Sequence, residues 1–225
     1  MKKSNLFLTI LGLLTCAMMV FTNFNLVQAY KKIDLSDPFK NYLPFQTEPY
    51  SVLILSGSNG YPIELKYAEE DGLMILRSRT EHLRRRSHGD TLFIEFTGAR
   101  ISKQQSQSSN APAAVIIQRS LLPEISASDI HVKISDFEKD DLELKIGGNA
   151  LTEIKNCQFN RMKVDLSQQG HLEFFAQNSV DSLQLSMANT SVAFLKNVNL
   201  HHIQQELSDS IAIVLSNHVF RDLIE

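Results

Sequence analysis

Five carboxylates in the second half of the chain have the chemistry for acid–base catalysis: Asp136, Asp140, Asp141, Glu143 and Glu173. Polysaccharide cleavage uses two such groups, one as the general acid and one as the base or nucleophile, on either side of a sugar bond. The segment from Asp136 to Asp141 is typical of a solvated turn between strands. We therefore expect no enzyme activity, and a carbohydrate-active β-helix enzyme that cleaves a polysaccharide is the alternative interpretation.

Asp136, Asp140 and Asp141 are also the candidates for a cation site, because carboxylates close in sequence can share a hard cation such as calcium. The segment lacks the Asp-x-Asp-x-Asp-Gly spacing of a calcium-binding loop. We expect no metal site and no cofactor, and the sequence assigns no catalytic or ligand-binding residue.

The other strongly charged segment runs from Arg77 to His88 and contains arginines at positions 77, 79, 84, 85 and 86. A patch that binds an anionic ligand is one interpretation. However, no aromatic residue is interleaved with the arginines and no glycine-rich phosphate loop accompanies them. A solvated strand end and hairpin loop is therefore the preferred interpretation.

The composition is that of an ordinary globular protein, with 225 residues, of which 43% are hydrophobic and 21% charged. The net charge of −3 gives no reason to expect nucleic acid as a partner. Cys157 follows an apolar run, and we expect a buried, unreactive thiol.

The N-terminus has the three parts of a secretory signal peptide. Met1-Lys2-Lys3 is basic, Leu6 to Phe21 is mostly apolar, and Val27-Gln28-Ala29 supplies small residues before a cut at Tyr30. The alternative is an N-terminal membrane anchor that is not cleaved. Either way we expect an exported protein, in the periplasm, on the outer surface or outside the cell. Its partner would be an envelope or extracellular glycan or protein, with membrane contact only through residues 1–29 if they are retained.

A repeat organises the elements that must position these side chains. Segments beginning at Leu142, Met162, Leu183 and Ile203 recur about every 20 residues. Each segment has apolar residues at alternate positions, then a turn of polar and small residues, then a second apolar run. One such coil cannot bury its own apolar face, so equivalent strands should stack in parallel. The predicted fold class is all-β, a parallel β-solenoid preceded by a smaller set of strands and hairpins.

Stacking also predicts which outward side chains lie side by side. Three such pairs are expected: Glu143 with Lys163, Lys145 with Asp165, and Gln184 with Gln204. Asn156, Asn197 and Asn217 occupy equivalent positions in their coils, where an asparagine with a left-handed backbone would turn a corner.

Four parts of the chain are expected. Residues 1–29 form the signal peptide, and residues 30–49, with three prolines, form a linker. Residues 50–120 form an N-terminal β region, and residues 121–225 form the coils, with a cap at 217–225 that has the apolar spacing of a short helix.

The order of these features resembles a known family. A strand with Ser-Gly at 52–57 precedes Gly-Asp-Thr-Leu-Phe-Ile at 89–94, then Ala-Val-Ile-Ile at 114–117 and Leu-Pro-Glu-Ile-Ser-Ala-Ser at 122–128, followed by the repeated coils. In this order the chain, from Val52 onward, is similar to the GIN domain family of auto-transporter adhesin heads, which are secreted bacterial envelope proteins. The resemblance implies a β-solenoid-like domain outside the cytoplasm, adhesin-like binding or scaffolding, and no catalytic residues.

Overall fold

The computed structural model describes residues 3–32, 37–57, 61–97, 112–208 and 210–215. The chain divides into two compact units, Met1–Asn41 and Tyr42–Glu225. The predicted boundaries after residues 29, 49 and 120 stay predictions, and the predicted cap at 217–225 lies outside the described residues.

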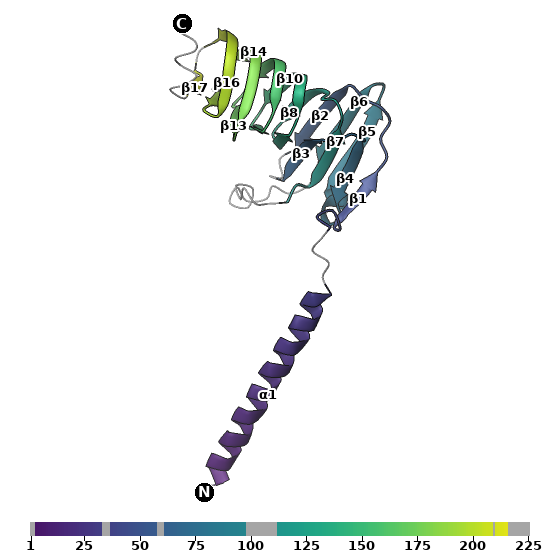
Figure 1. The fold of residues 1–225 in the computed structure, drawn as a ribbon, viewed down its shortest axis with the longest axis vertical. Coiled ribbons are helices and arrows are strands. Elements are labelled where there is room, and N and C mark those ends of the chain that lie inside the picture. Colours follow the sequence, from purple (N-terminus) through teal and green to yellow (C-terminus); the bar gives the residue numbers. More distant parts are fainter. Residues whose placement is uncertain (1–2, 33–36, 58–60, 98–111, 209, 216–225) are drawn as a thin grey trace. The chain divides into compact units, whose positions relative to one another are not determined.

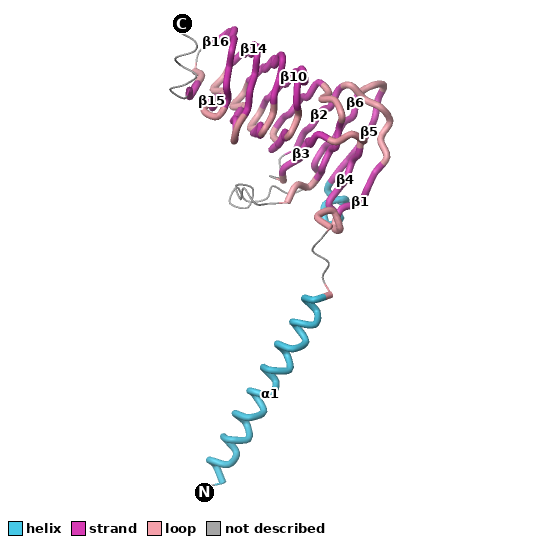
Figure 2. Tube along the Cα trace, in the orientation of Figure 1, coloured by secondary structure: helices cyan, strands magenta, loops and turns pink. Residues whose placement is uncertain are grey.

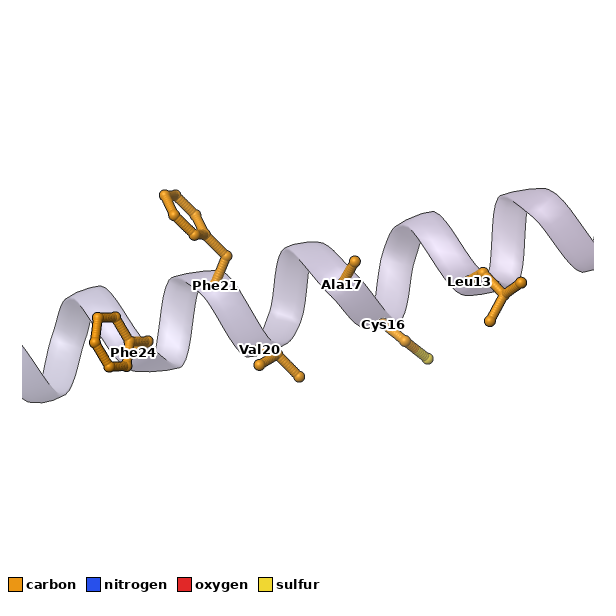
Figure 3. A pocket seen from close by; sticks show the side chains of 6 residues that line it. All are labelled: Leu13, Cys16, Ala17, Val20, Phe21 and Phe24. Carbon is orange, nitrogen blue, oxygen red and sulfur yellow. The ribbon is translucent and has the colours of Figure 1, made fainter.

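The first unit contains one long apolar helix, α1 (Lys3–Lys31). Its segment Thr9–Lys31 is long and apolar enough to cross a membrane, and none of that stretch is buried in the structure. A hollow of about 790 Å³ is lined by Leu13, Cys16, Ala17, Val20, Phe21 and Phe24. All six side chains belong to α1, as Figure 3 shows. The hollow is therefore a property of the surface of a single helix, and not a pocket formed between packed elements.

The second unit is all-β and consists of two large sheets (Figures 1 and 2). The nine-stranded sheet contains, in spatial order, β1 (Tyr42–Phe45), β4 (Gly72–Leu76), β7 (Val115–Arg119), β3 (Pro62–Tyr67), β9 (His131–Ser135), β11 (Leu151–Lys155), β13 (His171–Phe175), β15 (Val192–Leu195) and β17 (Ala212–Leu215). The eight-stranded sheet contains β16 (Val198–Leu207), β14 (Asn178–Met187), β12 (Gln158–Leu166), β10 (Glu138–Gly147), β8 (Glu124–Ser128), β2 (Val52–Gly57), β6 (Thr91–Phe96) and β5 (Leu83–His88). A 3-10 helix, η1 (Arg77–His82), lies between β4 and β5 in the sequence.

Parallel pairing dominates both sheets. Among the described strands, the antiparallel pairs are β1 with β4, β4 with β7, and β5 with β6. The predicted stacking of the repeat is confirmed: Leu142 pairs with Met162, Met162 with Leu183, and Leu183 with Ile203. Figure 1 shows the coils in sequence from β8 through β10 and β14 to β16.

Alternation along each strand separates core from surface. Leu142, Leu144 and Ile146 are at most 2% exposed, and the equivalent residues of β12 and β14 are as deeply buried. The edge coil differs, since Ile203 is half-buried and Leu207 is 45% exposed. Cys157 is buried, as predicted, and burial raises the pKa of its thiol to about 11.

The stack does not follow the order of the sequence. β2 lies between β6 and β8, and β3 lies between β7 and β9, in every case with parallel pairing. The strands of the predicted N-terminal β region thus continue the same two sheets as the coils. β1 lies within the segment predicted as a linker and pairs with β4 at the edge of its sheet, a position that tolerates Pro44.

Corner residues carry the left-handed backbone. Asp136, Asn156 and Ala176 stand at equivalent positions with φ of 67°, 53° and 58°. The predicted left-handed corner is confirmed for Asn156 and wrong for Asn197, which is not among the positive-φ residues of the described chain. Asn217 lies outside the described residues. The Asn197 side chain instead donates a hydrogen bond to the carbonyl of Phe174 (3.0 Å).

One corner contains an extra residue. Lys155 pairs with Phe175, but Gln158 pairs with Ser179, so the second coil is one residue longer at this corner. The buried side chain of Asn178 lies just beyond it. Its Oδ1 accepts a hydrogen bond from the Cys157 amide (3.0 Å). Its Nδ2 faces several carbonyl oxygens, of Phe175 (2.9 Å), Ala176 (3.3 Å), Asn197 (3.2 Å) and Ile154 (3.3 Å). Asn178 therefore joins three successive coils.

We expect Asn178→Ala to lower the free energy of unfolding by about 3 kcal/mol, because it leaves buried backbone groups of three coils without partners. Urea denaturation of both proteins measures the difference. Asn199→Ala, on the exposed side of β16, is the matched control and should change stability by less than about 0.5 kcal/mol. Equal stabilities of the two variants would show that Asn178 does not join the coils.

Candidate binding surface

A shallow groove of about 400 Å³ lies on the outer face of the eight-stranded sheet. It is lined by Leu122, Pro123, Glu124, Asp141, Leu142, Glu143, Arg161, Met162, Lys163, Ser182 and Gln184. These residues come from β8, β10, β12 and β14 and from the two residues before β8. The polar side chains face outward because the alternate residues of the same strands fill the core. The groove is thus a direct product of the parallel register.

Opposite charges on neighbouring strands neutralise one another along this groove. Lys163 Nζ lies 3.1 Å from Glu143 Oε1, which confirms the predicted pair. Arg161 donates to Asp141 Oδ2 through both Nε (3.0 Å) and Nη2. The hydrogen bond from Lys163 lowers the pKa of the Glu143 carboxyl. These exposed pairs contribute little stability, so their main effect is on register and surface charge.

Lys145 is paired differently from the prediction. It is the register partner of Asp165, but its ammonium group pairs with Glu124 and, at 3.6 Å, with Glu143. The hydrogen bond to Glu124 raises the pKa of Lys145. The carboxylate of Glu124 was not foreseen as a partner because its strand lies before the regular part of the repeat.

The carboxylates considered for catalysis do not gather in one place. Asp141 and Glu143 face the groove and are engaged in the ion pairs described above. Glu173 belongs to β13 in the other sheet. Asp136 is an exposed corner residue, and its Oδ1 accepts a hydrogen bond from Asn156 Nδ2 (3.4 Å).

Asp140 is half-buried at an irregularity in the β10–β12 pairing. Burial and, to a smaller extent, the charge of Asp141 raise the pKa of its carboxyl. Within the described residues, no group of three or more His, Cys, Asp or Glu side chains is arranged to hold a metal ion. The weak cation site considered at Asp136, Asp140 and Asp141 remains a sequence prediction.

A second polar cluster, on the nine-stranded sheet, was not predicted. Its members, here the histidine–glutamate cluster, are His131, Lys133, Glu153, His171 and Glu173. His131 Nε2 lies 3.1 Å from Glu153 Oε1, Lys133 Nζ lies 3.8 Å from Glu153 Oε2, and His171 Nε2 lies 3.8 Å from Glu173 Oε2. The signal was present in the sequence, because His131-x-Lys133, Leu151-x-Glu153 and His171-x-Glu173 follow one another at the coil spacing in the second apolar run.

Two like charges meet in this cluster, because Glu153 and Glu173 are direct register partners on adjacent strands. Strand spacing brings their backbones within about 4.8 Å. Burial raises the pKa of Glu153, but the close contact with His131 and the charges of His131, Lys133 and His171 outweigh it and lower that pKa. Lys133, together with the histidines when they are protonated, therefore compensates the repulsion between the two carboxylates.

His171 is on β13, the last strand of this cluster, and its ring is stacked on that of Phe194 of β15, with 5.0 Å between the ring centroids. Burial lowers the pKa of His171, and the charges of Glu173 and Glu153 offset only part of that effect. The folded state thus favours the neutral imidazole.

Comparisons with known proteins give similar structures but no family. The chain matches no family model and no curated protein sequence. Similar solved structures include a "putative adhesin" from Parabacteroides merdae, 9% identical, with 77% of this chain and 80% of that chain covered and a TM-score of 0.49. They also include a "putative lipid binding protein" from Parabacteroides distasonis, 12% identical, with 78% and 93% covered and a TM-score of 0.41. What those proteins bind is not transferred to this chain.

We expect His171→Gln to flatten the pH dependence of stability. Because the folded state has the lower pKa, the unfolded chain binds the proton more readily, and stability falls as pH drops below the ordinary histidine value of 6.5. The variant lacks this contribution, so its thermal midpoint should change less between pH 7.5 and pH 5. His202→Gln, on the exposed part of β16, is the control and should keep the wild-type profile. Parallel profiles for wild type and His171→Gln would contradict the assignment.

Proposed function

We propose that the protein is a non-catalytic, exported binding or scaffolding protein of the cell envelope, built as a parallel β-solenoid. The observation that carries this proposal is the in-register groove of about 400 Å³ on the eight-stranded sheet. Its residues come from consecutive coils, so its surface is set by the stack and not by a flexible loop. Such a surface suits recognition of an extended ligand through several weak polar contacts.

The state of the charged groups supports binding over catalysis. A catalytic acid or base needs a carboxyl group that is free to exchange a proton with substrate. In the groove, Asp141 and Glu143 each accept hydrogen bonds from a cation on the neighbouring strand. These hydrogen bonds stabilise the ionised form of both carboxylates. The two side chains are therefore held in place as polar groups that a ligand can contact.

The apolar helix α1 supports export. Its exposed Leu, Met, Phe and Val side chains are unfavourable in water, so the helix must enter a membrane or be removed. We infer that residues 1–29 act as a signal peptide that is cut before Tyr30, with an uncleaved anchor as the alternative outcome.

Mass determination of the protein after export tests this step. We expect a mature N-terminus at Tyr30 and release from the membrane fraction. Replacing Ala29 by a bulky residue, Ala29→Leu, should block processing and leave the full-length protein with the membrane, because signal cleavage requires a small residue there. An intact Met1 in the wild-type protein would identify an anchor, and a protein that stays in the cytoplasm would contradict export.

A binding screen tests the groove. Against a panel of envelope glycans and matrix proteins, we expect at least one ligand whose affinity falls about tenfold or more in Gln184→Trp, which fills the groove. Gln204→Trp is the matched control, because Gln204 is the register partner of Gln184 but does not line the groove. Cleavage of a polysaccharide by the wild-type protein would favour the enzyme, and equal effects of the two variants would exclude the groove as the site.

A further inference from the structure

A separate surface lies at the far edge of the eight-stranded sheet, where β5 is the outermost strand. Its sequence, Leu-Arg-Arg-Arg-Ser-His, places three consecutive arginines on this edge: Arg84, Arg85 and Arg86. All three are exposed. We call them the arginine edge. With Arg77 and Arg79 of η1, they give this short segment five arginines against one glutamate, in a chain whose net charge is −3.

The arginine edge differs from the groove because its arginines form no ion pairs within the described residues. In the described part of the chain, every ion pair involves a cation other than these three arginines. Glu95 is the register partner of Arg84 and is exposed, but the two side chains do not form an ion pair. A positive potential therefore remains at this edge, whereas the charges in the groove cancel.

Aromatic rings from other strands hold two of the guanidinium groups. The guanidinium carbon of Arg86 lies 4.6 Å from the centroid of Phe93, and that of Arg85 lies 5.0 Å from the centroid of Phe45. Arg85 Nη1 also donates to the carbonyl of Gln46 (3.1 Å). A ring covers one face of a guanidinium and leaves N–H groups at its rim, so the side chain is ordered before a ligand arrives. The segment itself contains no aromatic residue, and the fold supplies the rings of Phe45 and Phe93 from β1 and β6.

The geometry of an edge strand suits a linear polyanion. Arg84 and Arg86 project to the same side, opposite Glu95 and Phe93 in the register, with about 7 Å between their Cα atoms. Arginine pairs with carboxylate, sulfate and phosphate through two parallel hydrogen bonds. We propose that the arginine edge binds an anionic polysaccharide of the cell envelope. This inference rests on the proposed function only in requiring that the protein is exported. It does not depend on binding in the groove.

The test measures binding of the exported protein to polygalacturonate and dextran sulfate, with neutral dextran and phosphatidylglycerol vesicles alongside. We expect binding to the two anionic polysaccharides that weakens as salt rises, because released counterions contribute to the affinity. Arg84→Gln/Arg86→Gln should reduce the affinity at least tenfold, and Arg84→Lys/Arg86→Lys should reduce it less, since charge is kept but the paired hydrogen bonds are lost.

The matched control is Lys66→Gln/Lys155→Gln, which removes the same charge from the nine-stranded sheet. It should keep the wild-type affinity. The groove is tested with different variants, Gln184→Trp and Gln204→Trp, so failure of the groove proposal and failure of this one are distinguishable. The proposal is overturned if the wild type binds neither anionic polysaccharide or binds only the vesicles. It is also overturned if both double glutamine variants lose affinity equally. Unchanged binding with aggregation of Arg84→Gln/Arg86→Gln would instead assign these arginines to protection of the sheet edge.

Discussion

Parallel backbone pairing between equivalent residues of successive coils is the constraint on which the rest of the second unit depends. Side chains alternate along a strand, so a slip of one residue would turn Leu142, Leu144 and Ile146 from the core to water. Burial of these rows therefore fixes the register. Once the register is fixed, the position of every outward side chain relative to the neighbouring coil follows, including Glu143 beside Lys163.

The same constraint produces two different kinds of charged surface. Inside the stack, each strand has a neighbour on both sides, and unlike charges on adjacent strands neutralise one another along the groove. Where like charges do meet, as at Glu153 and Glu173, the histidine and lysine neighbours compensate. At β5 the stack ends, and its arginines have a neighbouring strand on one side only. The net positive charge of the arginine edge follows from that position.

Prediction succeeded where the relevant contacts repeat at a constant spacing. The alternating rows of Leu142, Met162 and Leu183, and the pair Glu143 and Lys163, could be read from the sequence because one interval relates them all. The histidine–glutamate cluster obeys the same interval and could have been found by applying it to the second apolar run. β1 is only four residues long and gave no periodic signal. The partners of Lys145 depended on side-chain reach, which register alone does not specify.

By itself, the sequence determined the coil length, the inward rows and the apolar N-terminal segment, because each depends on residues that are local or regularly spaced. Tertiary structure alone decided that β2 and β3 enter the middle of the sheets between strands that follow them in the chain. It also brought Phe45 and Phe93 under the arginines of β5. Such contacts join segments with no common period, so they follow from the burial of the whole core and not from any pattern along the chain.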